Sequence, residues 1–384
     1  MALPSSIGKV RPAKPGGRTI ERTTFVLPKS VDAADAQRAH CLVLVNGPDA
    51  GRRVTIPAEG LVIGRVPPAG LVLPDGDVSR LHCRVAVAGD KVVATDLGST
   101  NGTYVEGERL IGGAELAVGA VLRIGTRLLQ LERLTGRQLR QSEAQDRDIA
   151  AAVAYVTALL PPPLDTPAIQ TEWCYEPSAR LGGDAFGHGF LADGRFIVYL
   201  IDVAGHGAGA ALHAVAVMNL LRQRALPDTD MGDPGAVLAC LNRLFPMAAH
   251  ADMYFTAWYG VYDPATRLLR HASAGHHPAW LLAGVELAAI GTRNPMIGAV
   301  AGRDFKVGET SLPTGASLYL FSDGVFEIVD HMARRWTLSD FTALIGKHRD
   351  DPAGEAQALL RTVRAEVPSG ALDDDFSLVI VRLP

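Results

Sequence analysis

The sequence is short of the features that mark several common protein classes. Its cysteines are few and scattered, so no disulfide framework is indicated and a reducing cytoplasm is the expected compartment; they are Cys41, Cys83, Cys174 and Cys240. No apolar run approaches the ~20 residues that a membrane-spanning helix needs, and the N-terminal segment lacks the apolar core of a signal peptide. The formal net charge of -4 gives no electrostatic case for nucleic acid. We therefore expect a cytoplasmic protein with neither membrane nor nucleic acid as a partner.

Two further motifs are missing. No Cys/His spacing typical of zinc occurs, and no G-x-x-x-x-G-K-[ST] phosphate loop occurs, which argues against a nucleotide-handling enzyme. What is present is a chain of 384 residues with 48% apolar and 20% charged content, long enough to bury two cores. Residues 1–38 are rich in Pro, Gly, Lys and Arg and predict a disordered basic tail.

One stretch, residues 182–207, predicts a hairpin that brings two carboxylates together. Asp193 and Gly194 form a turn signal between apolar runs, and a hairpin centred there places Asp184 opposite Asp202. Two such groups repel unless one is protonated or a cation lies between them. Flanking glycines leave the backbone open to close approach. From the hairpin alone, an exposed turn and a metal site both remain open.

Two distant strands carry further acids at their ends. The apolar run 316–322 ends on Asp323, and the acidic run 373–375 precedes another apolar strand. A sheet end collects such side chains into one place. Four carboxylates, from Asp184, Asp202, Asp323 and Asp374, suit hard divalent cations that prefer oxygen ligands.

The motifs GGDAF, DVAGHG, AGHHP, SDG and DDDFS, in this order, resemble the SpoIIE-type bacterial serine/threonine phosphatases of the metal-dependent PPM (type 2C) group. The resemblance implies two Mn²⁺ or Mg²⁺ ions and a metal-bridging water that attacks the phosphorus of a phosphoserine or phosphothreonine. The implied metal ligands are Asp184, Asp202, the main-chain carbonyl of Val203, Asp323 and Asp374. This ligand set assumes that residues 374–377 align with the family's D-D-x-T/S motif, so that Asp374 is a ligand and Asp373 is not.

Several residues near these motifs have two interpretations. Many relatives carry an acid where this chain has Gly187, which puts a third metal site in doubt. His206 either donates a proton to the leaving serine oxygen or caps the following helix. For His276 and His277 a structural role in a turn is favoured over metal ligation, and Arg180 is a candidate contact for the substrate phosphate.

Residues 39–134 consist of short β-type runs broken by glycine, which predicts a β-sandwich. Within them LVIGR, VSRLHCRV and DLGSTNGTYVEG resemble the forkhead-associated (FHA) domain, which binds phosphothreonine peptides. The matching residues are Arg65 and Ser79 for the phosphate, with Arg80, Thr100 and Asn101 as supporting contacts. His82 is expected to anchor a loop. The alternative is that the sandwich does not bind phosphate and serves only for packing.

Residues 135–165 predict a helical linker between the domains. An apolar stripe recurs at helical spacing and ends before three prolines; it comprises Ile149, Val153, Val156 and Leu160. The ALLPPPL ending resembles the leading segment of SpoIIE-type phosphatases. The stripe either pairs two subunits into a homodimer or docks on its own domain.

These observations predict a multidomain protein: an all-β FHA sandwich, the helical linker, and an α/β PPM phosphatase at 166–384 with two central antiparallel sheets flanked by helices. The expected function is dephosphorylation of a phosphoprotein by two-metal water attack, targeted or regulated by the FHA domain. Family resemblance implies a STAS-type anti-sigma-factor antagonist as substrate. The rival is an inactive phosphatase-like scaffold that acts through phosphopeptide binding. Thr23 or Thr24, once phosphorylated, is a further candidate ligand for the FHA site.

Overall fold

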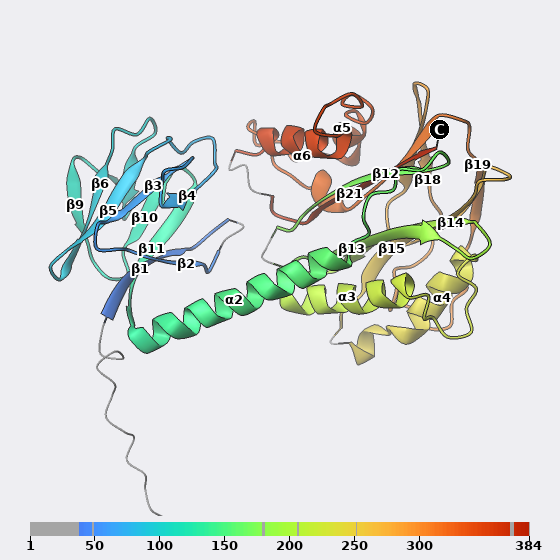
Figure 1. The fold of residues 1–384 in the computed structure, drawn as a ribbon, viewed down its shortest axis with the longest axis horizontal. Helices are drawn as coiled ribbons and strands as arrows, with labels where there is room; N and C mark the ends of the chain where they lie inside the picture. The colour runs from blue at the N-terminus through green and yellow to red at the C-terminus, as the bar shows by residue number, and fades with distance from the viewer. Residues whose placement is uncertain are drawn as a thin grey trace, which may run out of the picture.

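The computed structural model describes residues 38–47, 50–178, 181–205, 207–250, 252–368 and 372–383. Thr23, Thr24, Arg180 and His206 lie outside these ranges. Two bodies are joined by one long helix (Figure 1). We call residues 38–135 the sandwich and residues 164–383 the layered body.

The sandwich consists of two sheets that face each other. In spatial order, the first sheet contains β2 (Arg53–Thr55), β1 (Arg38–Leu44), β11 (Arg127–Thr135), β10 (Val121–Ile124), β7 (Thr103–Val105) and β8 (Glu108–Arg109). The second contains β4 (Leu71–Val72), β3 (Leu61–Gly64), β5 (Cys83–Ala88), β6 (Lys91–Asp96) and β9 (Gly113–Leu116). Inward-facing side chains of both sheets, among them Leu42, Ile63 and Leu122, form one core. The predicted β-sandwich is confirmed.

Helix α2 (Gly136–Leu159) links the two bodies. It begins with a capping box, in which the Thr135 side chain accepts from Gln138 N while the Gln138 side chain accepts from Thr135 N. The helix ends before Pro161 because proline cannot continue its hydrogen bonding. Leu159 and Leu160 enter the core of the layered body, whereas the rest of the stripe, Ile149, Val153 and Val156, is half-buried. No helix within the described ranges combines the length and apolarity needed to cross a bilayer.

The layered body contains two antiparallel sheets. In spatial order, the first has β12 (Gln170–Glu176), β21 (Phe376–Leu383), β20 (Ala316–Phe321), β17 (Ala279–Ala283) and β18 (Glu286–Ile290). The second has β13 (Asp184–Phe190), β14 (Phe196–Val203), β15 (Phe255–Asp263), β16 (Leu268–Ala274) and β19 (Gly308–Ser311). Phe186, Trp258 and Val379 belong to the core between them.

Helices cover the outer faces of this pair of sheets. On one side, α3 (Ala208–Arg222) packs on β13 and β14, and α4 (Pro234–Leu244) packs on β15 and β16. On the other, α6 (Glu355–Glu366) packs on β12 and β21 beside α5 (Leu338–Thr342) (Figure 1). Two short 3₁₀ turns, η1 (Met247–Ala249) and η2 (Asp323–Val325), lie in the connections. The predicted α/β architecture, two antiparallel sheets flanked by helices, is confirmed.

Candidate functional site

The hairpin β13–β14 has the predicted register. Asp184 pairs directly with Asp202, and the strands turn at Asp193 and Gly194, where Gly194 has a φ of 88°. The left-handed backbone explains the glycine, because a side chain would be strained there. The two aspartates consequently lie side by side at one end of the second sheet.

The structure gathers the four predicted acids into one electrostatic cluster. Asp184 is 4% exposed, and burial followed by the charges of Asp202 and Asp375 raises its pKa well above the ordinary value. Burial and the neighbouring Asp323 and Asp374 raise the pKa of Asp202 to about 8. The pKa of Asp323 rises to about 6, from burial and then from Asp374. We call the four predicted carboxylates the acid cluster.

Contacts between β20 and β21 bring the two distant acids to this sheet end. The backbone N–H of Ser322 donates to Ser377 O at 3.0 Å, and that of Ser377 donates to Ser322 Oγ at 3.1 Å. Ser322 Oγ donates to Asp375 O at 2.9 Å. Gly324 has no space for a side chain, since a Cβ there would lie 2.2 Å from Asp375 O. The SDG and DDDFS segments are thus packed backbone to backbone.

Asp375 has a role that the sequence reasoning missed. Its Oδ2 accepts from Gly183 N at 2.6 Å, and its Oδ1 accepts from Ser178 N at 2.8 Å and Ser178 Oγ at 3.0 Å. These bonds fasten the loop before Asp184 to the loop that carries Asp374, whose Oδ1 accepts from Asp375 N at 2.8 Å. The carboxylate of Asp375 is therefore used to position the backbone. This supports the sequence alignment in which Asp374, and not Asp375, is the candidate metal ligand.

Glu327 is a second acid that the sequence reasoning did not select. Its charge acts on both Asp202 and Asp323, so it lies near the exposed side of the cluster. Its spacing of four residues from Asp323 across the η2 turn was a usable signal. Asp373, by contrast, is exposed and shows no such influence on the cluster.

The donor set fits a hard divalent cation, although the side chains do not already enclose one. Among the described residues, no group of three or more His, Cys, Asp or Glu side chains is arranged to hold a metal ion. However, Asp184 Oδ2 is buried and has no hydrogen-bond partner of ordinary geometry among the described residues, and the nearby hydroxyls of Ser322 and Ser377 favour its charged form less than burial and the neighbouring acids oppose it. A desolvated carboxylate oxygen without a partner is costly unless a cation meets it. The main-chain carbonyl oxygen of Val203 lies beside Gly183, the residue that precedes Asp184, because a Cβ added to Gly183 would be 2.8 Å from that oxygen.

Of the two histidines of AGHHP, His276 is buried and His277 is half-buried against the end of β20. Burial lowers the pKa of His276 to about 3 and that of His277 to about 4, so both imidazoles are neutral at pH 7. His276 Nδ1 lies 2.9 Å from His277 O, and the His277 ring packs 4.8 Å from that of Phe321. These contacts suit a structural role in supporting the end of β20.

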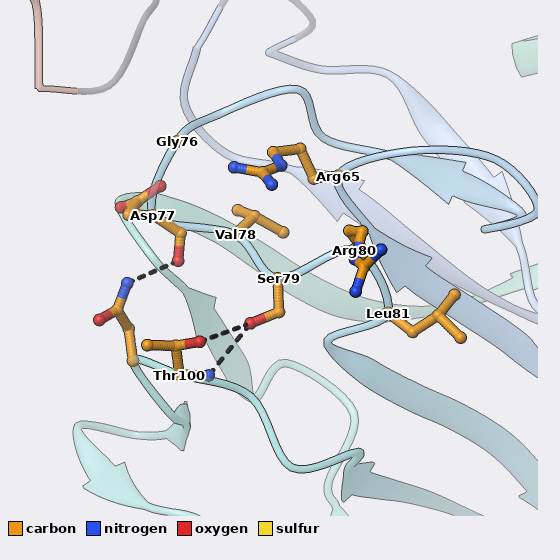
Figure 2. A pocket seen from close by; sticks show the side chains of 9 residues that line it. Arg65, Gly76, Asp77, Val78, Ser79, Arg80, Leu81 and Thr100 are labelled. Carbon is orange, nitrogen blue, oxygen red and sulfur yellow. Dashed lines mark hydrogen bonds between the residues drawn. The ribbon is translucent and has the colours of Figure 1, made fainter.

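A second site occupies one end of the sandwich. A cavity of ≈ 520 Å³ is lined by Arg65, Gly76, Asp77, Val78, Ser79, Arg80, Leu81, Thr100 and Asn101, which include all five residues predicted to contact a phosphopeptide (Figure 2). Thr100 N donates to Ser79 Oγ at 3.0 Å, and Asn101 Nδ2 donates to Asp77 O at 2.8 Å. We call this cavity the phosphate pocket after the ligand that the sequence predicts for it; a guanidinium, a hydroxyl and a side-chain amide are among its lining groups.

The polar side chains of His82 and Asp96 hold the loops of the phosphate pocket. His82 is fully buried; its Nδ1 accepts from Ser79 N at 3.0 Å, so its Nε2 donates to Gly102 O at 3.2 Å. The expected anchoring role of His82 is confirmed. Burial opposes ionisation of Asp96, but hydrogen bonds from Ser99 and Thr103 outweigh it and lower the pKa to about 2.

Comparisons with known sequences separate the chain into two regions. Residues 192–384 match the family model for Stage II sporulation protein E (SpoIIE), and residues 43–134 match the model for the cytoplasmic domain of an inner membrane component of T3SS. The chain is 28% identical over 270 residues to the phosphoserine phosphatase RsbU of Bacillus subtilis, covering 67% of this chain and 76% of RsbU. It is 34% identical over 120 residues to the FHA domain-containing protein FhaB of Mycolicibacterium smegmatis, covering 30% of this chain and 77% of FhaB.

Among solved structures, the SiaA-PP2C domain of Pseudomonas aeruginosa is similar to the layered body. The TM-score is 0.54 at 19% identity, and the match covers 64% of this chain and 99% of that domain. At this identity the likeness establishes the fold of the layered body.

Proposed function

This chain belongs to the SpoIIE family and carries an N-terminal FHA domain, and on that premise we propose that it is a metal-dependent protein serine/threonine phosphatase whose FHA domain binds phosphothreonine. The observation that carries the proposal is the acid cluster, and above all the buried, unpartnered Oδ2 of Asp184. A purely structural aspartate in this position would have a hydrogen-bond donor.

The proposed ligands of two Mn²⁺ or Mg²⁺ ions are Asp184, Asp202, the Val203 carbonyl, Asp323 and Asp374. When bound, such ions neutralise phosphate charge and lower the pKa of a water molecule that attacks phosphorus. The chain supplies the geometry: Asp375 holds Gly183, and therefore Asp184, against the loop that carries Asp374. His206 is the proposed proton donor to the leaving oxygen, because an imidazole can donate a proton near neutral pH.

Arg65 and Ser79 are the proposed phosphate contacts at the FHA domain, with Arg80, Thr100 and Asn101 in support. Their convergence on one pocket of ≈ 520 Å³ supports the assignment. The proposed substrate of the layered body is a phosphoserine on a STAS-type antagonist of an anti-sigma factor. RsbU, a relative, is named as a phosphoserine phosphatase, which supports the phosphoserine preference.

Hydrolysis of p-nitrophenyl phosphate and of a phosphoserine peptide, measured with and without Mn²⁺, tests the proposal. Activity should require the cation and be lost in Asp202→Ala and Asp323→Ala, while the exposed control Asp304→Asn retains it. Cation-independent activity would contradict the metal-dependent mechanism, whereas no activity in a folded protein that still binds phosphothreonine peptide would favour the inactive scaffold.

We also propose that α2 mediates a homodimer. Its stripe is only half-buried within one chain, and Tyr155 on the same helix is 59% exposed. Light scattering of the full chain tests this, because Ile149→Glu should convert a dimer to a monomer. A monomeric parent protein would contradict it.

A separate hypothesis, that phosphorylated Thr23 or Thr24 occupies the FHA site, predicts weaker peptide binding after kinase treatment.

A further inference from the structure

A second cavity lies between the two bodies. It has a volume of ≈ 280 Å³ and is lined by Asn46, Gly47, Thr126 and Arg127 of the sandwich and by Ser178, Leu372 and Asp373 of the layered body. We call it the interdomain cleft. Since residues of both bodies line it, the bodies lie close to each other here as well as being joined through α2.

On the sandwich side, the cleft and the phosphate pocket share a wall. Arg127 lines the cleft, and its Nε and Nη2 donate to the carboxylate of Asp75 at 2.6 and 2.8 Å. Asp75 begins the segment whose next residues, from Gly76 to Leu81, line the phosphate pocket. Asp77 on that segment packs on the turn before Arg127, because a Cβ on Gly125 would lie 2.4 Å from Asp77 Oδ2. One loop therefore separates the two cavities.

On the opposite side, the cleft is lined by residues that adjoin the acid cluster in sequence or through hydrogen bonds. Asp373 is exposed and immediately precedes Asp374. Ser178 donates two hydrogen bonds to Asp375, the residue that positions Gly183 beside Asp184. The cleft thus has phosphate-binding groups beyond one wall and the acid cluster beyond the other.

The lining of the cleft suits a peptide chain better than a third phosphate. The charge of Arg127 is neutralised by Asp75, with which it forms an ion pair that is 6% and 2% exposed. Asn46 uses both ends of its side chain, donating to Thr126 O and accepting from Leu128 N. The exposed carboxylate of Asp373 would repel a phosphate. A polar cavity whose described lining residues include no uncommitted cation fits an extended, uncharged segment.

We propose that the phosphate pocket, the cleft and the acid cluster form one bipartite substrate site. Its substrate class is a protein segment that carries a phosphothreonine and, on the same chain, a phosphoserine. Arg65 and Ser79 hold the phosphothreonine, the connecting residues follow the cleft, and the phosphoserine is hydrolysed at the acid cluster. This inference rests on the proposed function and adds to it that the FHA domain presents the substrate in cis.

Synthetic peptides with both phosphates test the inference on the full chain with Mn²⁺. The spacers run from about 4 to about 16 residues, which at about 3.3 Å per residue span up to about 53 Å. Each peptide is compared with a partner of the same sequence in which the threonine is not phosphorylated. The measured quantity is the ratio of kcat/KM for the two peptides within each protein variant.

At the best spacer the ratio should reach about tenfold or more, mainly through KM, because tethering raises the effective concentration of the phosphoserine. In Arg65→Ala the ratio should fall to about one. Thr126→Tyr, which narrows the cleft from an exposed position, should lower the ratio. Its matched control is Val118→Tyr, since Val118 is 59% exposed at the opposite end of β10.

Each alternative outcome is decisive. A ratio near one at every spacer, in a protein that hydrolyses phosphoserine and binds phosphothreonine peptide, overturns this inference alone. An equal rate increase from an unlinked phosphothreonine peptide also overturns it, because the FHA domain would then regulate rather than present. No Mn²⁺-dependent hydrolysis of either peptide overturns the proposed function and this inference with it.

Discussion

Replacing Asp184 with asparagine should stabilise the metal-free protein, which is unusual for a change at a buried polar residue. Facing residues of an antiparallel pair have Cβ atoms about 5 Å apart, and two ionised carboxylates at about 5 Å repel by about 3 kcal/mol at an effective dielectric constant of about 20. Asp184 faces Asp202 in this register and is 4% exposed. Asparagine keeps the shape and removes the charge, so up to about 3 kcal/mol is relieved at a pH above about 8, where Asp202 is ionised, and less at neutral pH, where its raised pKa keeps it largely protonated.

The same substitution should weaken the response to divalent cations. A cation at about 100 times its Kd stabilises the protein that binds it by about 2.7 kcal/mol. For a domain of this size, about 1 kcal/mol corresponds to a Tm shift of about 2–4 °C. The parent protein should therefore gain about 5–11 °C from Mn²⁺, whereas Asp184→Asn should start from a higher Tm and gain much less.

Differential scanning calorimetry of the full chain, in EDTA and in excess Mn²⁺, measures both effects. The transition that responds to the cation identifies the layered body. The exposed Asp304→Asn variant serves as the control and should match the parent in both conditions. The reasoning is refuted if Asp184→Asn lowers the metal-free Tm, or if it gains as much from Mn²⁺ as the parent does.

Three further predictions follow from single contacts. Arg65→Ala should weaken phosphothreonine peptide binding about 10- to 100-fold in calorimetry, with Arg65→Lys intermediate because lysine lacks the guanidinium fork; unchanged affinity would remove Arg65 from the site. Arg127→Met should destabilise the sandwich by about 3–5 kcal/mol in chemical denaturation because it leaves Asp75 buried and unpaired, and adding Asp75→Leu should restore most of the loss; no recovery would contradict the ion-pair argument. Asp375→Ala should lower Mn²⁺-dependent activity about 10- to 100-fold in a folded protein because Gly183 loses its anchor, and activity within about twofold of the parent would show that the anchor is dispensable.

The sequence by itself determined the features that depend on short-range rules. The turn at Asp193 and Gly194 and the alternation of the flanking strands specify the hairpin, and with it the pairing of Asp184 with Asp202. Helical spacing and the prolines determine where α2 ends. Ordered motifs were sufficient for the family, because five short matches in the right order restrict the alternatives strongly.

Only the tertiary structure decided which distant groups meet. Ser178 and Asp375 are 197 positions apart, and their hydrogen bonds depend on β12 and β21 being neighbours in one sheet. Likewise, Arg127 and Asp75 form an ion pair across 52 positions, and that pair lies between the phosphate pocket and the cleft. Such contacts have no local sequence signature. The loop-closure entropy that they cost is offset only when the surrounding core packs, and that depends on the whole fold. The sequence therefore names candidate groups, and the packing of the two bodies decides which of them act together.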